Sequence, residues 1–249
     1  MKRALIVGGA NGIGLSIATE LAKRDSVEII YIIDKSPLAP EFMNYKFKSI
    51  IFDLTSDDYS LFDNFNDIDT LMITAGFGQL ALFKDIAESH IKASFDVNAI
   101  APIRIIHHFM NRLMSNDDFR CGVMVSIAGF MSSPFFAVYG ATKAALKIFI
   151  ESVNVELEKS GSKNRILNVS PGSIKGTSFN QGKTDLSATS QLANEIIANL
   201  EAKNDLFIPK YEEIFKTVLA RYQADFRAEG RHSYEYKLNS TRMNICKGK

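Results

Sequence analysis

Residues 2–14 read KRALIVGGANGIG, and this stretch decides the fold that the rest of the chain has to continue. Lys2 to Val7 is short and largely apolar, which predicts a buried strand. Leu15 to Arg24 follows with the apolar spacing of an amphipathic helix. A strand that runs through a glycine turn into a helix is the start of an α/β unit.

The glycines of the turn have separate tasks. Gly8 permits the tight turn, Gly12 lets the backbone approach a pyrophosphate, and Gly14 allows the helix to pack closely on the strand. The pyrophosphate would lie on free N–H groups at the positive end of the helix. Because strand, turn and helix occur in the required order, we predict a dinucleotide site that also includes Asn11 and Ile13.

An acidic residue lies at the distance that the ribose of such a dinucleotide requires. The apolar strand predicted for Val27 to Ile33 ends at Asp34, twenty residues after Gly14. A carboxylate there commonly receives the ribose hydroxyls and repels the extra phosphate of NADP. Lys35 is adjacent and could partly host that phosphate, so we expect NAD to be preferred and NADP to be possible.

Strands and helices alternate along the remainder of the chain. Further strands are predicted at 48–52, 68–74, 121–126, 165–169 and 206–208, and helices at 56–65, 88–114, 139–159, 190–203 and 212–227. This alternation predicts one α/β domain over residues 1–249, a doubly wound Rossmann fold with about seven parallel strands and helices on both faces. Residues 178–249 are expected to form a substrate-lid and C-terminal region, and composition leaves 230–249 either a partly disordered tail or an arm over a neighbouring subunit.

One stretch carries side chains suited to proton transfer. Ser126 ends a predicted strand, and Tyr139 and Lys143 follow four residues apart, so that the latter two share one face of a helix. A neighbouring ammonium is expected to lower the pKa of a tyrosine, and a serine hydroxyl can polarise a carbonyl oxygen. Tyr and Lys one turn apart also occur as an ordinary solvated helix face, so the spacing alone is a weak signal.

A proline in the helix predicted for 88–114 adds a fourth group. Pro102 has no N–H and leaves the carbonyl of Asn98 free, so the helix should bend there. We predict that this carbonyl anchors a water molecule that links Lys143 to solvent. An incidental proline kink is the alternative.

The candidate residues converge on one edge of the predicted sheet. Ligands of doubly wound sheets bind at the carboxyl ends of the strands. The further candidates for cofactor binding follow predicted strands, and they are Asp53, Leu54, Ala75, Gly76, Pro171, Gly172, Ile174 and Thr177. Asp53 could bind the adenine amine or simply end its strand.

Composition excludes several other classes of protein. The chain has 249 residues, 46% of them hydrophobic, and a formal net charge of +1, so no overall field indicates nucleic acid or an anionic membrane. No apolar run is long enough to span a bilayer, and Ala4 to Val7 is too short for a signal peptide. Cys121, Cys246 and the four histidines show no metal-ligand spacing, so we expect no metal and a cytoplasmic location.

Over about residues 3–210 the chain resembles the short-chain dehydrogenase/reductase family. The matching positions, in order, are Gly8, Gly12, Gly14, Asp53, Ala75-Gly76, Asn98, Ser126, Tyr139, Lys143 and Pro171-Gly172. The resemblance implies NAD(P)-dependent oxidation or reduction, with Tyr139 as acid/base and Ser126 holding the substrate oxygen. It further implies that Lys143 binds the nicotinamide ribose and lowers the tyrosine pKa, that Asn98 holds a relay water, and that the chain forms a homodimer or homotetramer.

Three residues at two places in the chain depart from the family pattern. Val7 stands where a threonine is usual, and Ile73-Thr74 stands where Asn-Asn is usual. These positions mainly stabilise the sheet centre and the cofactor loop, so the departures concern cofactor affinity rather than chemistry.

These features predict an enzyme that interconverts an alcohol and a ketone or aldehyde, acting on a small-molecule substrate. Three alternatives remain: a dinucleotide-binding redox sensor without turnover, an NAD-dependent isomerase or dehydratase, and an interaction module that uses the basic C-terminal stretch. Five phenylalanines suggest an apolar substrate, or are ordinary core, and they are Phe77, Phe130, Phe135, Phe136 and Phe179.

Overall fold

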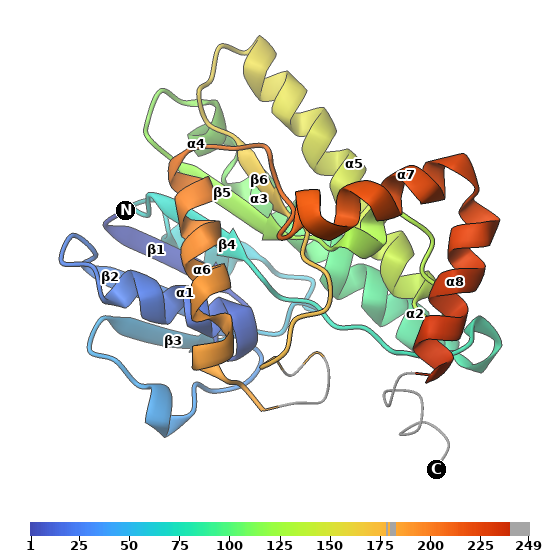
Figure 1. Cartoon of the computed structure of the whole chain (residues 1–249). Helices are drawn as coiled ribbons and strands as arrows, with labels where there is room; N and C mark the ends of the chain where they lie inside the picture. Colours follow the sequence, from blue (N-terminus) through green and yellow to red (C-terminus); the bar gives the residue numbers. More distant parts are fainter. Residues whose placement is uncertain (178, 180–182, 240–249) are drawn as a thin grey trace.

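A seven-stranded parallel sheet runs through the centre of the protein, as a computed structural model describes it for residues 1–177, 179 and 183–239 (Figure 1). The strand order is β3-β2-β1-β4-β5-β6-β7, and every neighbouring pair is parallel. The strands are β1 Arg3–Val7, β2 Ile29–Asp34, β3 Phe47–Ile51, β4 Thr70–Ile73, β5 Arg120–Met124, β6 Ile166–Val169 and β7 Leu206–Phe207. The sheet confirms the predicted doubly wound fold.

Helices cover both faces of the sheet, so its strands are buried on both sides. Ala4 and Ile6 of β1 belong to the core formed with α1 and α6, whereas Leu5 and Val7 belong to the core formed with α3 and α5. The alternation follows from the two-residue period of a strand. The covering helices are α1 Gly12–Ala22 and α6 Leu186–Glu201 on one face, and α2 Glu88–Phe95, α3 Ala101–His108, α4 Met110–Met114 and α5 Ala137–Lys159 on the other.

The predicted helix over 88–114 is wrong as one continuous element. A π-helical turn, η4 Asp96–Ile100, separates α2 from α3, and Phe109 separates α3 from α4. Pro102 lies in the first turn of α3, where its missing N–H interrupts the regular hydrogen bonding. A wider helical turn therefore lies at Asn98, where the sequence predicts a bend.

Two further predicted helices have different forms. The segment 56–65 contains only a short 3-10 helix, η2 Ser60–Asn64. The predicted final helix is a π-helical turn, η7 Tyr211–Phe215, followed by α7 Lys216–Ala224.

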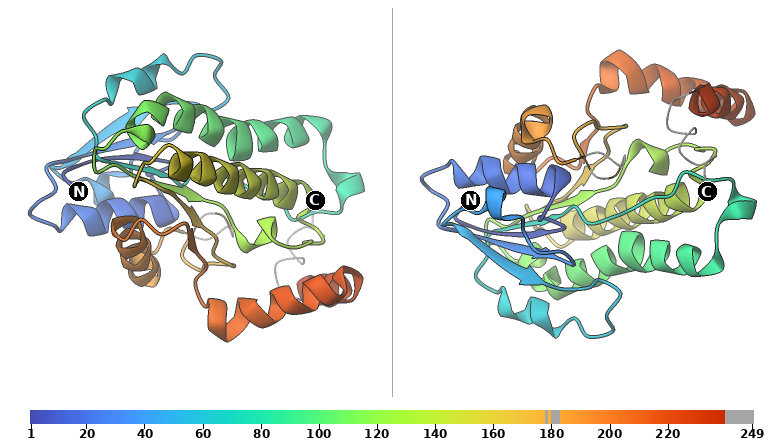
Figure 2. Two further views of the ribbon diagram at one scale, coloured as in Figure 1. Left: turned by 90° about the horizontal axis from the view of Figure 1, so that it is seen from above. Right: turned by 90° about the horizontal axis from the view of Figure 1, so that it is seen from below.

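The stretch after Gly230 continues a helix instead of forming a tail. This helix, α8 Phe226–Asn239, packs back on the same chain, and residues 240–249 lie outside the described part. Figure 2 shows α7 and α8 as an arm on the same side of the sheet as α6, beyond the carboxyl ends of the strands.

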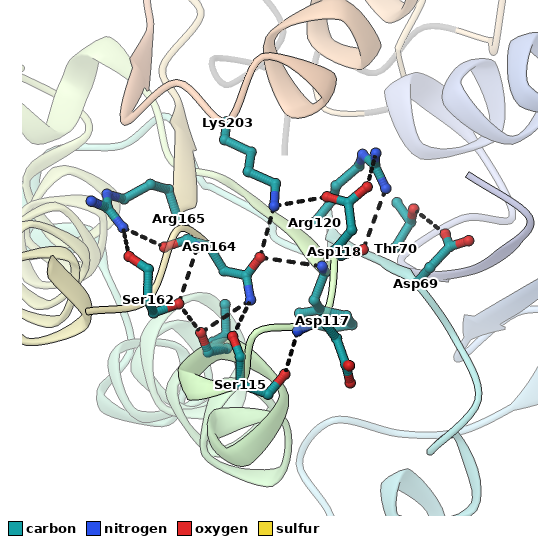
Figure 3. A network of polar contacts seen from close by, with 12 residues as sticks. Asp69, Thr70, Ser115, Asp117, Asp118, Arg120, Ser162, Asn164, Arg165 and Lys203 are labelled. Carbon is teal, nitrogen blue, oxygen red and sulfur yellow. Dashed lines mark hydrogen bonds and ion pairs between the residues drawn. The ribbon is translucent and has the colours of Figure 1, made fainter. Parts of the chain in front are cut away.

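At the opposite, amino end of the sheet, a network of polar contacts joins β5, β6 and α6. We call Ser115, Asp118, Ser162, Asn164 and Lys203 the Asn164 network (Figure 3). The buried Asn164 amide donates to three backbone carbonyls and accepts from the Phe119 N–H and from the Lys203 ammonium. Lys203 also forms an ion pair of 2.7 Å with Asp118. These contacts tie the segments that precede β5 and β6 to the end of α6.

Candidate active site

The glycine turn has the geometry that its sequence predicts. Gly8 has a left-handed φ of +83°, and a Cβ there would overlap the backbone of Ala75. A Cβ on Gly14 would overlap the carbonyl of Gly8, so the missing side chain lets α1 begin directly against the strand end. Gly12, with φ +54°, is the first residue of α1. The turn brings β1, α1 and the end of β4 together.

A hydroxyl that sequence reasoning did not identify lies at this helix start. The Gly12 N–H donates to Thr184 Oγ1 at 3.1 Å, across 172 residues of sequence. Thr177 lies over the same glycine, since a Cβ on Gly12 would come within 3.7 Å of its side chain. No local pattern signals this approach, because the segment after β6 reaches the turn only through the tertiary fold.

Asp34 lies at the end of β2 and beside the turn. Its carboxylate accepts the N–H of Ala10 at 3.0 Å and that of Ser36 at 3.2 Å. A carboxylate oxygen has more than one lone pair, so these bonds leave capacity for ribose hydroxyls. The position is the one that its spacing from Gly14 predicts.

Asp53 and Lys35 are exposed near the same corner. Hydrogen bonds from the backbone and hydroxyl of Thr55 hold the pKa of Asp53 below its usual value, and the charge of Lys35 contributes. Asp53 therefore ends its strand as a turn-forming residue, and its role toward adenine stays a prediction. Leu54 beside it packs partly against the core.

The Asn98 side chain joins the loop after β4 to α5. Its Oδ1 accepts the Phe77 N–H at 2.9 Å, and its Nδ2 donates to the Phe77 carbonyl and to Thr142 Oγ1. A Cβ on Gly76 would lie 3.3 Å from both Asn98 Oδ1 and Lys143 Nζ. Asn98 thus fixes the loop against which Lys143 rests, while the predicted relay water on its backbone carbonyl stays a prediction.

Ser126, Tyr139 and Lys143 meet at the carboxyl end of β5. The Tyr139 side chain lies beside Ser126, whose hydroxyl acts to lower the tyrosine pKa, and Ser126 Oγ donates to the Pro171 carbonyl at 3.5 Å. Lys143 Nζ donates to the Met124 carbonyl at 2.8 Å and lies 5.7 Å from the centre of the Tyr139 ring. The Y-x-x-x-K pair therefore faces the protein interior beside Ser126, and is not a solvated helix face.

The expected effect of Lys143 on Tyr139 is wrong for this structure. Burial raises the pKa of Tyr139 to about 12, and the Ser126 hydroxyl acts in the opposite direction. Burial also lowers the pKa of Lys143 to about 7. Loss of hydration disfavours the charged form of each group, and Lys143 is turned toward a carbonyl instead of the phenol. Tyr139 is consequently protonated at neutral pH.

The segment after β6 passes close to the site. Pro171 is buried and accepts from Ile127 N–H as well as from Ser126. A Cβ on Gly172 would lie 2.7 Å from the ring of Phe215, so the C-terminal arm leaves no room for a larger residue there. Thr177 Oγ1 donates to the Ile174 carbonyl at 3.3 Å.

Two of the five candidate phenylalanines lie on Tyr139. Its ring centre is 5.6 Å from that of Phe136 and 5.1 Å from that of Phe179. Phe77 instead contacts His90, and Phe130 lies under the Lys147 ammonium. Phe135 stacks on Tyr234 of α8, a residue that sequence reasoning did not connect with the site because the two are far apart in the chain.

The arrangement fits a dinucleotide. Close approaches that only glycine allows, a carboxylate at the end of β2 and a buried lysine beside Gly76 occupy the same edge of the sheet. The residues that would hold it are those of the glycine turn, Asp34, the Ala75-Gly76 loop, Lys143 and the segment from Pro171 to Thr177.

The comparisons with known proteins identify the family. The sequence profile of the short chain dehydrogenase family matches residues 2–187. An uncharacterized oxidoreductase of Saccharomyces cerevisiae is 27% identical over 247 residues, covering 88% of this chain and 79% of its own. One of Staphylococcus epidermidis is 26% identical over 195 residues, covering 73% and 84%. The chain therefore belongs to the short-chain dehydrogenase family and is an oxidoreductase.

Solved structures show the same fold. A short chain dehydrogenase/reductase from Burkholderia phymatum, in complex with NAD, has a TM-score of 0.77 at 15% identity, covering 92% of this chain and 95% of that one. One from Burkholderia cenocepacia, in complex with NADP, has a TM-score of 0.73 at 19% identity, covering 96% and 100%. Members of the family use NAD or NADP.

Among the helices of the described residues, none combines the length and the apolar character that crossing a bilayer requires.

Proposed function

We propose that this chain interconverts an alcohol and a ketone or aldehyde with NAD(P), and that NAD is preferred. The observation that supports this most directly is that Ser126 and Tyr139 lie side by side next to the buried Lys143, at the edge of the sheet that carries the glycine turn. When bound, the dinucleotide would supply or accept the hydride. The side chains of the chain would carry out the rest of the reaction.

In the reducing direction each side chain has a defined task. Ser126 would bind the substrate oxygen, and Tyr139, which is protonated at neutral pH, would donate its proton to that oxygen. Lys143, with a pKa of about 7, exchanges protons readily near neutral pH and would restore the proton of Tyr139. The aromatic rings of Phe136 and Phe179 around Tyr139 favour an apolar substrate and restrict water.

Preference for NAD follows from the charge next to the glycine turn. Asp34 would bind the ribose hydroxyls and repel the 2′-phosphate of NADP, whereas Lys35 would attract it. The Asp34 carboxylate is fixed by two backbone N–H groups, while Lys35 is exposed. We therefore expect the fixed carboxylate to dominate.

The experiment is a titration of the protein with NADH and, separately, NADPH, followed by the fluorescence of the reduced nicotinamide. The chain contains no tryptophan to interfere. Oxidation of the better-bound cofactor is then measured with apolar ketones and aldehydes. Binding without turnover of any of them would favour the redox-sensor alternative, and absence of binding would overturn the proposal.

We also propose a homodimer or homotetramer formed through the helices that hold Asn98 and Tyr139. Ile100, Ile148 and Val155 are exposed apolar side chains on η4 and α5, with exposed fractions of 46%, 58% and 56%. Burying such side chains between subunits would be favourable. Sedimentation equilibrium of the wild type, compared with an Ile148→Lys variant, tests this; a monomer in both would contradict it.

A further inference from the structure

The C-terminal helix α8 lies on the loop that leads into the catalytic helix. Gly230, Tyr234 and Lys237 are spaced four and three residues apart, so they share one face of α8. A Cβ on Gly230 would lie 3.5 Å from Ser132 Oγ. The ring of Tyr234 stacks on that of Phe135, with centres 4.5 Å apart and planes inclined by 29°.

Lys237 binds the same loop by hydrogen bonds. Its Nζ donates to Ser133 Oγ at 2.7 Å and to the Pro134 carbonyl at 2.8 Å. The ammonium also lies 5.5 Å from the centre of the Phe136 ring. Burial lowers the pKa of Lys237 to about 8, and the contact is partly shielded from water. One face of α8 therefore contacts loop residues 132–136 at successive positions.

The loop needs such support because its backbone is strained. Phe135 is buried and has a φ of +67°, a left-handed conformation that a bulky residue rarely adopts. Such a conformation persists only where the surroundings determine it from more than one side. Here the Phe135 carbonyl accepts the Ala81 N–H at 3.0 Å, and Tyr234 covers the ring.

The conformation at Phe135 sets the start of α5. The next residue, Phe136, is the N-cap of α5, and its carbonyl accepts the Gly140 N–H at 2.7 Å. The Phe136 ring also lies against Tyr139. A change of φ at Phe135 would rotate this first turn and thereby move the Tyr139 hydroxyl relative to Ser126.

We propose that Tyr234 and Lys237 are positioning residues for Tyr139, which act by holding loop residues 132–136 in their observed conformation. The inference rests on the proposed function for its catalytic consequence. It makes α8, which lies beyond the residues matched by the family profile, a working part of the active site.

The test uses two tyrosines on the same helix. Tyr234 stacks on Phe135, whereas Tyr236 is 69% exposed. Tyr234→Ala is expected to lower kcat by at least ~10-fold, since small misplacements of reacting groups are costly. The affinity for NADH should stay within ~2-fold because the glycine turn is not touched. Tyr236→Ala should change neither quantity, and Tyr234→Phe, which keeps the ring, should retain the wild-type kcat.

Hydrogen–deuterium exchange provides a readout that does not require turnover. Tyr234→Ala and Lys237→Met should each speed exchange at residues 130–140, including the Gly140 amide, without changing exchange in α1. Tyr236→Ala should leave both segments as in the wild type. Lys237→Met also keeps the inference testable if Tyr234→Ala fails to fold.

Equal kcat and equal exchange in Tyr234→Ala and Tyr236→Ala would overturn the inference. So would a rise in KM for the dinucleotide with kcat unchanged, because that would indicate a general structural effect. If the wild type turns over no substrate, the proposed function fails, and the exchange at residues 130–140 alone decides whether α8 holds the loop.

Discussion

Two lysines at opposite ends of the sheet have opposite electrostatic surroundings, and Lys203 is partly exposed whereas Lys143 is buried. Lys203, in the Asn164 network at the amino end, is paired with Asp118 and bonded to the Asn164 amide, and it lowers the pKa of the Asp118 carboxyl. Lys143, at the carboxyl end, is 2% exposed and bonded to a backbone carbonyl, and no carboxylate of the described residues is among the influences on its pKa, which falls to about 7.

The difference separates stability from function. At the amino end the polar groups satisfy one another, so removing any of them should cost folding free energy and leave the chemistry intact. At the carboxyl end a cation is held where its charge is poorly compensated, which costs stability and gives a group that exchanges protons at neutral pH. The following predictions address this comparison, beginning with the largest effect.

Tyr139→Phe should lower kcat by ~10³-fold or more, because the proton donor next to Ser126 is lost. Affinity for the dinucleotide and the melting temperature should change little, since the ring and its contacts with Phe136 and Phe179 remain. Steady-state kinetics and cofactor fluorescence measure these quantities, with Tyr236→Phe as the control. Undiminished turnover in the variant would remove Tyr139 from the reaction.

Lys143→Met should lower turnover by at least ~10²-fold and stabilise the fold at neutral pH. The pKa of Lys143 falls from 10.5 in the unfolded chain to about 7 in the folded protein. Burial of Lys143 therefore lowers the free energy of unfolding by its full amount below pH 7. This destabilisation disappears as the pH approaches 10.5, since Lys143 then loses its proton in the unfolded state as well. Each pKa unit corresponds to about 1.4 kcal/mol, so Lys143→Met should raise the free energy of unfolding by a few kcal/mol at pH 7.

Urea unfolding of this variant, measured from about pH 6 to about pH 10 in steps of about one pH unit, tests the sign of this pH dependence. The advantage of Lys143→Met over the wild type should shrink as pH rises. Lys147→Met is the matched control, because Lys147 lies one turn further on α5 and pairs with Glu151 at the surface. An advantage that grows with pH would contradict the assignment of Lys143.

Asn164→Ala should have the opposite effects to Lys143→Met, with stability lost and turnover kept. Its amide makes five hydrogen bonds, and their loss would release the segments before β5 and β6 from the end of α6. We expect the free energy of unfolding to fall by about 3 kcal/mol with kcat unchanged. Denaturant unfolding and kinetics are to be compared with Asn116→Ala, which alters an exposed residue nearby. A large loss of kcat below the melting temperature would contradict the separation of the two ends.

Asp34→Ser should have the smallest effect. Removing the fixed charge beside the turn should improve the affinity for NADPH relative to NADH by roughly 10-fold, about 1.4 kcal/mol. The Ala10 and Ser36 N–H groups donate to different oxygens of Asp34, so a single serine hydroxyl replaces at most part of these contacts. Lys35→Ala should shift the ratio toward NADH, and an unchanged ratio in both variants would place the choice of cofactor elsewhere.

The sequence predicts the sheet and most of the site because both depend on local patterns. Strands and helices alternate along the chain, and the carboxyl ends of parallel strands meet at one edge, so Gly8, Asp34, Ser126 and Pro171 could be placed together. Tyr139 and Lys143 followed from helical spacing.

Other features depend on burial and on long-range contacts. The pKa values of Tyr139 and Lys143 are set by desolvation, which local spacing does not show, and they differ from the expectation based on their proximity. The π-helical turn at Asn98 and the left-handed φ of Phe135 are backbone conformations that the local residue types do not require, so the sequence does not predict them. The packing of α8 joins residues about a hundred positions apart, beyond any periodicity.

The contact between α8 and loop residues 132–136 has a consequence for the order in which the protein folds during synthesis. Lys237 binds Ser133 across 104 residues of sequence, so the hydrogen bond closes a long loop. Long loops cost more chain entropy to close than short ones. During synthesis, Ser126, Tyr139 and Lys143 leave the ribosome well before α8. A nascent chain that still lacks α8 would therefore carry all the proposed catalytic groups, and α8 would add its contacts with loop residues 132–136 only after it has emerged.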